Sequence, residues 1–212
     1  MAGKFISFEG PDGAGKTSVL KKIGTKLEKQ LGSQLILTRE PGGNPISESI
    51  RRIILDRANT KMDARTEALL YAAARRQHLV EQIIPALEDD KVVLSDRYVD
   101  SSIAYQGAGR EIGTKAVWQM NQFATAGLEP DLTIYLDIEP EEGIKRIKQH
   151  RQNEINRLDV EQLAFHKRVR AAYLELFNQY PDRIKLIDAS QPFEKVVLAV
   201  QKAITQKYPD LF

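Results

Sequence analysis

The sequence of 212 residues contains no cysteine. Its absence excludes disulfide bonds, thiolate metal sites and cysteine nucleophiles within this sequence. The three histidines, His78, His150 and His166, are scattered, and their spacing suits neither a metal site nor a catalytic triad. We therefore expect each histidine to be structural or exposed.

The sequence also lacks an excess of charge of one sign and any long apolar run. Its 31 basic and 29 acidic residues leave a net charge of +2, which gives no evidence for nucleic acid or an anionic membrane as a partner. No run approaches the ~18 apolar residues of a membrane span, and residues 1–9 lack the apolar core of a signal peptide. We expect a cytoplasmic protein that acts on small molecules.

Short apolar runs alternate with helical patterns along the chain. The expected strands are 5–8, 35–38, 92–94, 132–136 and 184–187. The expected helices are 16–31, 46–56, 64–88, 114–126, 140–150, 160–180 and 193–206. This alternation predicts a three-layer α/β/α fold with a five-stranded parallel sheet covered on both faces. No linker rich in Pro, Gly and Ser interrupts it, so we expect one domain over residues 1–212.

A phosphate-binding sequence follows the first expected strand and opens the first expected helix. It consists of Gly10, Pro11, Asp12, Gly13, Ala14, Gly15, Lys16, Thr17 and Ser18. This is the P-loop pattern G-x-x-x-x-G-K-[ST] in the setting that it requires. Its glycines let backbone N–H groups turn toward one anion, and the helix N-terminus adds positive charge. We expect Lys16 to reach the outer phosphates of a nucleotide and Thr17 to contact Mg²⁺. A Gly-rich hairpin or linker is the alternative.

Charged residues follow the other expected strands, where ligands bind in parallel α/β sheets. These residues are Arg39-Glu40-Pro41-Gly42-Gly43, Asp96-Arg97-Tyr98, Asp137 and Asp188-Ala189-Ser190. Asp96 has the position of an acid that holds Mg²⁺ opposite Thr17, although a helix cap is the alternative. We expect Arg97 to face a transferring phosphate. Glu9 is either a second acid near the metal or a charge at a strand end.

Two helical segments carry side chains that could bind a base. Tyr71 and Arg75 share one face at i, i+4, which suits a base stacked on the ring with its carbonyl near the guanidinium. A half-buried tyrosine beside an exposed arginine is the alternative. Ser102, Tyr105 and Gln106 share a face of a helix that begins near 100, and Gln106 offers both a donor and an acceptor. We expect residues 107–110 to form a loop.

The polar segment 146–159 contains Arg146, Arg151 and Arg157. The P-loop has no arginine between Gly10 and Lys16, so a basic group for the moving phosphoryl must come from elsewhere. We interpret the segment as a lid that also keeps water from the γ-phosphate. A solvated helical hairpin is the alternative.

These motifs together resemble the thymidylate kinases, a family of P-loop nucleoside monophosphate kinases. The resemblance runs through nearly the whole chain in family order. It rests on Phe8-Glu9-Gly10 to Lys16-Thr17, Thr38-Arg39-Glu40-Pro41-Gly42-Gly43, Arg65–Arg76, Asp96-Arg97-Tyr98, Asp100–Gln106 and Asn156-Arg157-Leu158-Asp159. It implies a P-loop NTPase fold, transfer of a phosphoryl group from ATP to dTMP with Mg²⁺, and a homodimer.

The resemblance also implies roles for individual residues. Near the acceptor, Glu40 with Pro41 would lie by the sugar, and Arg51 and Arg97 would contact the phosphate. Either Glu40 or Tyr105 would lie near the 2′ position. At the base, Tyr71 would stack on the ring, where many relatives carry phenylalanine, and Arg75 would meet the thymine carbonyl. Ser102 and Gln106 would read the pyrimidine edge. The arginines of the lid indicate the bacterial type, in which Arg151 or Arg157 contacts the moving phosphoryl.

Two other functions remain open at this stage. A kinase for a deoxynucleoside or another monophosphate is the nearer one, and a nucleoside acceptor would need a general base such as Glu40 or Glu9. The more distant one is a nucleotide switch or binding module without a second nucleotide pocket.

On the 114–126 helix, Trp118 and Phe123 indicate either packing or a dimer face.

Overall fold

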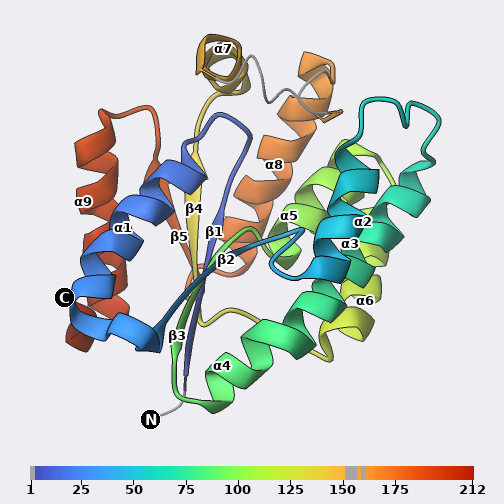
Figure 1. Cartoon of the computed structure of the whole chain (residues 1–212). Helices are drawn as coiled ribbons and strands as arrows, with labels where there is room; N and C mark the ends of the chain where they lie inside the picture. Colours follow the sequence, from blue (N-terminus) through green and yellow to red (C-terminus); the bar gives the residue numbers. More distant parts are fainter. Residues whose placement is uncertain (1–2, 151–156, 159–160) are drawn as a thin grey trace.

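The computed structural model of the chain describes residues 3–150, 157–158 and 161–212. Over these residues, helices cover both faces of a five-stranded sheet with the order β2-β3-β1-β4-β5 (Figure 1). All neighbouring strands are parallel. The strands are β1 (Lys4–Glu9), β2 (Leu35–Arg39), β3 (Val92–Asp96), β4 (Leu132–Asp137) and β5 (Ile184–Asp188). The predicted three-layer fold and its five strands are confirmed.

The helices follow the predicted segments, with ends that differ by a few residues. They are α1 (Lys16–Leu31), α2 (Pro45–Leu55), α3 (Ala64–His78), α4 (Ile84–Glu88), α5 (Val99–Ser102), α6 (Thr114–Thr125), α7 (Pro140–His150), α8 (Leu163–Gln179) and α9 (Phe193–Lys207). The predicted helix over 64–88 is one helical run in which a π-helical turn, η2 (Leu79–Ile83), joins α3 to α4. Pro85 follows this turn and has no N–H group to donate. No helix in the described part of the chain is long and apolar enough to span a membrane.

Side chains of the central strand alternate between the two faces of the sheet. On one face, Ile6 and Phe8 of β1 pack in the core cluster that includes residues of α1 and α9. On the other face, Phe5 packs with Leu79 and Ile83 of the π-helical turn. Because both faces of the strand are buried, its apolar residues Phe5, Ile6 and Phe8 do not alternate strictly with polar ones.

The prediction of a loop at residues 107–110 is wrong for residues 107–109, which are helical. A second π-helical segment, η3 (Ile103–Gly109), continues α5 and packs against α6 and α8. A Cβ on Gly107 would lie 2.9 Å from Cα of Thr114 at the start of α6. The glycines that suggested a loop instead allow a helical segment to approach its neighbours closely.

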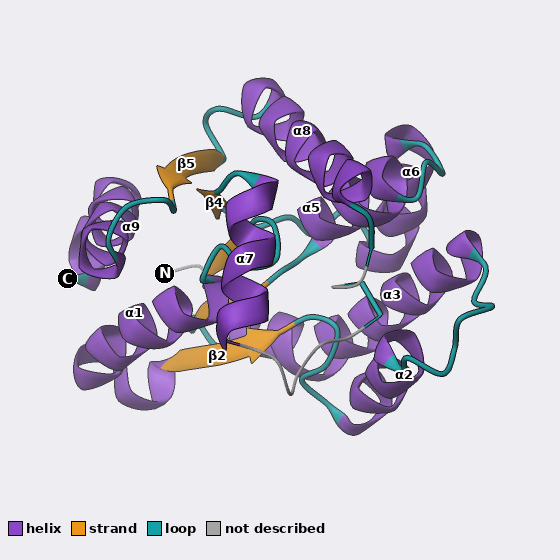
Figure 2. Cartoon of the chain, turned by 90° about the horizontal axis from the view of Figure 1, so that it is seen from above, coloured by secondary structure: helices purple, strands orange, loops and turns teal. Residues whose placement is uncertain are grey.

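A pair of glycines allows α7 to lie directly on the P-loop, above the carboxyl ends of the strands (Figure 2). A Cβ on Gly143 of α7 would lie 2.6 Å from the carbonyl oxygen of Asp12. A Cβ on Gly13 would lie 2.2 Å from the carbonyl oxygen of Gly143. Both close contacts are with backbone atoms, so a larger side chain would push the helix and the loop apart.

We predict that Gly143→Ala destabilises the protein. Helix propensity alone would stabilise an alanine in α7 by up to about 1 kcal/mol. The contact with Asp12 instead predicts a loss of about 1–3 kcal/mol in the free energy of unfolding, as for other overpacked sites. Urea denaturation measures the sign, and Lys145→Ala, at an exposed position of the same helix, is the control. A more stable Gly143→Ala protein would contradict the proposed close contact.

Candidate active site

The P-loop lies between β1 and α1 and holds Lys16 in a buried position. Its glycines Gly10, Gly13 and Gly15 have φ values of 140°, 83° and 86°, which side chains with a Cβ rarely adopt. The Lys16 ammonium donates to the carbonyl oxygens of Gly10 at 2.9 Å and Pro11 at 2.8 Å. Burial, followed by the nearby Arg97 charge, lowers the pKa of Lys16 to about 8. An anion bound in the loop would favour the charged form of this lysine.

The two predicted metal ligands lie side by side. The Thr17 hydroxyl at the start of α1 donates a hydrogen bond to the Asp96 carboxylate at the end of β3. Among the described residues, no cluster of three or more histidine or acidic side chains could hold a metal ion. One hydroxyl and one carboxylate fit Mg²⁺, which usually takes few protein ligands and completes its shell with phosphate oxygens and water.

Arg97 connects the P-loop to the segment after β3. Its guanidinium lies 2.6 Å from the Asp12 carboxylate and donates to the Ser101 hydroxyl at 2.9 Å. The Tyr105 hydroxyl donates to the other oxygen of the same carboxylate at 2.7 Å, and the Arg97 guanidinium lies 4.8 Å from the centre of the Tyr105 ring. Arg97 itself has a positive φ of 78°. Asp12, Arg97 and Tyr105, which are all predicted site residues, therefore meet in one place.

Arg75 is the buried member of the Arg75–Arg76 pair, and Arg76 is exposed. Its Nε donates to Oε2 of Glu40 at 2.6 Å. The rest of its guanidinium donates to the Ser102 hydroxyl, to the carbonyl oxygen of Tyr98 and to the side-chain oxygen of Asn121. Three predicted residues, Glu40, Arg75 and Ser102, thus form one network. Sequence reasoning missed Asn121, because nothing in the spacing of α6 relates it to α3.

Two further residues extend this network toward β2 and α2. The buried ring of His78 lies 3.2 Å from the Glu40 carboxylate through Nδ1 and 2.6 Å from the Thr38 hydroxyl through Nε2. This contact supports the structural role expected for His78. Arg51 of α2 donates to the carbonyl oxygen of Pro41 at 2.9 Å, so Arg51 and Pro41 also meet at this edge.

Tyr71 lies on α3 one turn before Arg75 and packs at the edge of the cluster that contains Tyr105. Burial raises the pKa of its hydroxyl, and the nearby Glu67 carboxylate raises it further. Arg97, Asp12 and Arg51 also lie close enough to affect its pKa. The tyrosine is therefore near the residues expected at the acceptor phosphate.

Ser102, Tyr105 and Gln106 contact three different partners. Ser102 binds Arg75 and Tyr105 binds Asp12, whereas the Gln106 amide nitrogen donates to Glu67 at 2.9 Å. The shared face predicted for them assumed an α-helix. Because η3 is π-helical, its side chains do not follow the α-helical i, i+3 and i+4 pattern.

Glu67 is a buried carboxylate that the sequence analysis did not single out. Besides Gln106, it faces Arg110 at 3.2 Å and pairs with Arg157. Arg157 also donates to the carbonyl oxygen of Ile54 at the end of α2. Of the two predicted lid arginines, Arg157 thus lies beside α2 and α3, and Arg151 lies outside the described residues.

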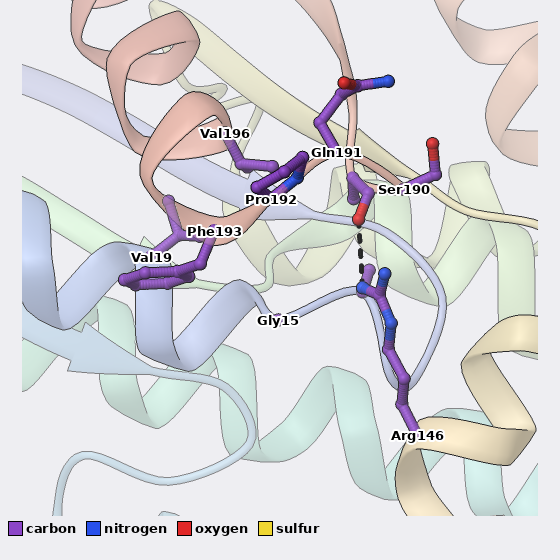
Figure 3. A pocket seen from close by; sticks show the side chains of 10 residues that line it. Gly15, Val19, Arg146, Ser190, Gln191, Pro192, Phe193 and Val196 are labelled. Atoms are coloured by element: carbon purple, nitrogen blue, oxygen red, sulfur yellow. Dashed lines mark hydrogen bonds between the residues drawn. The ribbon is translucent and has the colours of Figure 1, made fainter.

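A cavity of about 390 Å³ adjoins the P-loop and the start of α1. Arg146 of α7 lies at one wall and donates to the carbonyl oxygen of Ala189 at 3.0 Å, while Pro192 and Phe193 lie opposite (Figure 3). The cavity is lined by Ala14, Gly15, Val19, Arg146, Ala189, Ser190, Gln191, Pro192, Phe193 and Val196. Its guanidinium, apolar side chains and polar loop atoms suit a flat heteroaromatic ring.

The comparisons with known proteins agree with this geometry. The thymidylate kinase family model matches residues 8–200. The chain is 64% identical over 209 residues to a thymidylate kinase of Lactiplantibacillus plantarum, covering 99% of this chain and 95% of the relative. It is 65% identical to that of Levilactobacillus brevis over the full length of both. The chain belongs to the thymidylate kinase family.

A solved structure supports the same assignment at the level of the fold. The crystal structure of thymidylate kinase from Ehrlichia chaffeensis superposes with a TM-score of 0.79 at 31% identity. The match covers 97% of this chain and 99% of that one. The resemblance seen in the motifs is therefore confirmed, and the chain is a member of a phosphotransferase family with a P-loop fold.

The sequence left open the role of one further acid at this site, Glu9. Its buried carboxylate accepts hydrogen bonds from the backbone N–H of Tyr98 at 2.6 Å and from the Ser101 and Tyr173 hydroxyls. Ser101 in turn accepts from Arg97. Burial and the nearby Asp100 charge raise the pKa of Glu9 from 4.5 to about 7.

We predict that Glu9 makes stability depend on pH between about 4.5 and 7. In this window the native state binds a proton at Glu9 that the unfolded chain has released, so the free energy of unfolding falls as pH rises. From the two pKa values the loss is at most about 3 kcal/mol, and it is complete above pH 7. Urea denaturation across this range should show a smaller decrease for Glu9→Gln than for the unchanged protein. Parallel pH profiles would contradict the assignment.

Proposed function

We propose that this chain transfers the γ-phosphoryl group of ATP to the 5′-phosphate of dTMP, giving ADP and dTDP, a step toward dTTP. One observation carries the proposal. The carboxylate of Asp12, within the P-loop, is bonded to Arg97 and Tyr105 on the acceptor side. The donor site and the proposed acceptor site thus share a wall, as direct transfer between two phosphates requires.

On the donor side, Lys16 would exchange the carbonyl oxygens of Gly10 and Pro11 for the outer phosphates of ATP. Thr17 and Asp96 would hold Mg²⁺, which when bound neutralises charge on the phosphate oxygens. We place the adenine ring in the cavity beside Arg146 and Phe193, because it adjoins the start of α1 and offers a guanidinium and apolar walls.

On the acceptor side, Arg97 and Arg51 would bind the 5′-phosphate, with Glu40 and Pro41 near the sugar. Tyr71 would stack on thymine, while Arg75, Ser102 and Gln106 bind its edge. A phosphate acceptor is already anionic at neutral pH, so no general base is needed. The chain contributes position and charge neutralisation.

The lid over residues 146–159 stays a proposal. Within it, Arg146 contacts Ala189 and Arg157 pairs with Glu67, whereas residues 151–156 and 159–160 lie outside the described part of the chain. We propose that Arg151 or Arg157 contacts the moving phosphoryl group when both substrates are bound. We also propose that the enzyme acts in the cytoplasm.

The geometry does not favour a kinase for a nucleoside. Such an acceptor would require a base for its hydroxyl proton. Glu40 is bonded to Arg75 and His78, and Glu9 accepts three hydrogen bonds in a buried position. Either carboxylate would have to lose hydrogen bonds to its present partners before it could accept the hydroxyl proton of a nucleoside.

The proposal predicts a specific pattern of acceptors. ADP release from Mg-ATP should be fast with dTMP and far slower with CMP, AMP and thymidine, and it should require Mg²⁺. Lys16→Ala should lower turnover by at least about a hundred-fold while the folded state persists, because the lysine acts mainly on transferring charge. Rapid turnover of thymidine would contradict the acceptor assignment, and acceptor-independent ATP hydrolysis would favour a nucleotide switch.

We further propose that the enzyme is a homodimer that uses the face formed by α3 and α6, which pack against each other. Large apolar side chains are exposed on both helices, with Leu69 59% and Phe123 91% exposed. A side chain as exposed as Phe123 contributes nothing to the core of the monomer, whereas it would be buried against a second copy.

The dimer is tested by Phe123→Asp. A charge at this position should shift the mass in solution from two chains to one, because an unpaired carboxylate would be buried in the interface. Light scattering after size-exclusion chromatography measures the mass. Leu198→Asp on α9, at a position 61% exposed on the other side of the sheet, is the control and should remain dimeric. A dimer that persists in Phe123→Asp would exclude this face.

A further inference from the structure

Next to the proposed base site, a buried carboxylate binds the nitrogen of a side-chain amide but not its oxygen. The carboxylate is that of Glu67 in the first turn of α3, and the amide is that of Gln106 in η3. Both side chains are almost completely buried. Their hydrogen bond, 2.9 Å from Nε2 to Oε1, is made from the amide nitrogen.

The direction of this hydrogen bond follows from chemistry. An ionised carboxylate only accepts hydrogen bonds, whereas a glutamine amide has a nitrogen that donates and an oxygen that accepts. Glu67 faces the guanidinium groups of Arg110 and Arg157, which can only donate hydrogen bonds to it. The amide nitrogen of Gln106 must therefore point to Glu67. The amide oxygen has no hydrogen-bond partner among the described residues.

The free oxygen belongs to a side chain within the proposed acceptor site. Glu67 lies one turn before Tyr71 on α3, and Gln106 lies four residues after Ser102, which is bonded to Arg75. These are the side chains to which the proposed function gives the thymine ring and its edge. The Gln106 oxygen is thus an acceptor held ready for a donor on the base.

We propose that Glu67 is a positioning residue that fixes the amide of Gln106 and thereby selects thymine over cytosine. The inference rests on the proposed function. Thymine has an N–H donor at N3, which the amide oxygen can accept. Cytosine has a lone pair at N3, so two acceptors would face each other. With Glu67 in place, the amide cannot turn to offer its nitrogen to cytosine.

The test compares the affinities for dTMP and dCMP, measured by calorimetry without ATP. In the Glu67→Gln variant, the carboxylate is replaced by an amide that can donate as well as accept hydrogen bonds, so the Gln106 amide becomes free to turn. The preference for dTMP, as the ratio of the two dissociation constants, should fall roughly ten-fold. Unchanged preference in Glu67→Gln would overturn the proposal.

Two control variants separate amide orientation from a structural effect. Arg110→Gln removes an ion pair of Glu67 but keeps its bond to Gln106, so the preference should persist. Gln106→Met removes the amide, and Glu67→Gln should then lower the preference no further. Two results would overturn the role assigned to Glu67. One is a loss of preference in Arg110→Gln as large as that in Glu67→Gln, and the other is a further loss when Glu67→Gln is added to Gln106→Met.

Two further observations keep the test decisive. If Glu67→Gln does not fold, the side-chain amide signal of Gln106 in the unchanged protein, assigned by its loss in Gln106→Met, provides the readout. Its hydrogen exchange should be slow before and after dTMP is added, and fast exchange would overturn the proposal. Absence of dTMP binding by the unchanged chain would overturn the proposed function and this inference together, whereas an unchanged ratio overturns this inference alone.

Discussion

The ion pair between Asp12 and Arg97 links the P-loop to the proposed acceptor site. Asp12 belongs to the P-loop after β1, and Arg97 follows β3, the neighbouring strand. One carboxylate oxygen lies 2.6 Å from Arg97, and the other accepts a hydrogen bond from Tyr105 at 2.7 Å. Charge-assisted bonds of this kind are short and directional. A shift of the P-loop would break at least one of them, so the distance between the P-loop and the proposed acceptor site depends on this carboxylate.

The charges behind this pair are buried, and each has partners from distant segments. Glu9, Glu40 and Glu67 are each less than 5% exposed, and an unpaired charge in such a position would cost several kcal/mol. Glu40 and Glu67 face guanidinium groups, whereas Glu9 has neutral donors and the nearby charge of Asp100. Burial, followed by the nearby charge of Asp100, raises the pKa of Glu9 to about 7. The same network that positions Arg75 and Arg97 thus makes the fold sensitive to pH.

Local spacing in the sequence predicted what depends on neighbours along the chain. The P-loop follows from a sequence motif, the strands follow from short apolar runs, and the shared face of Tyr71 and Arg75 follows from their i, i+4 spacing. Asn121 and Glu67 could not be found in this way, because each meets its partners only after α3, α6 and η3 have packed together. The π-helical form of η3 was missed for a related reason. Its glycines look like a loop until the close approach of Thr114 is seen.

Glu40 and Glu67 hold Arg75 and Gln106, the two side chains proposed to contact the base edge, in opposite ways. Glu40 accepts from Arg75, which has five N–H groups, and four of these have partners among the described residues. A donor therefore remains on its Nη2. Glu67 accepts from the amide nitrogen of Gln106, which leaves an acceptor. A donor beside an acceptor matches a base edge that has a carbonyl next to an N–H group, as thymine has. On the proposed function, two acids that need not touch the base would thus determine the hydrogen-bond pattern that the base must match.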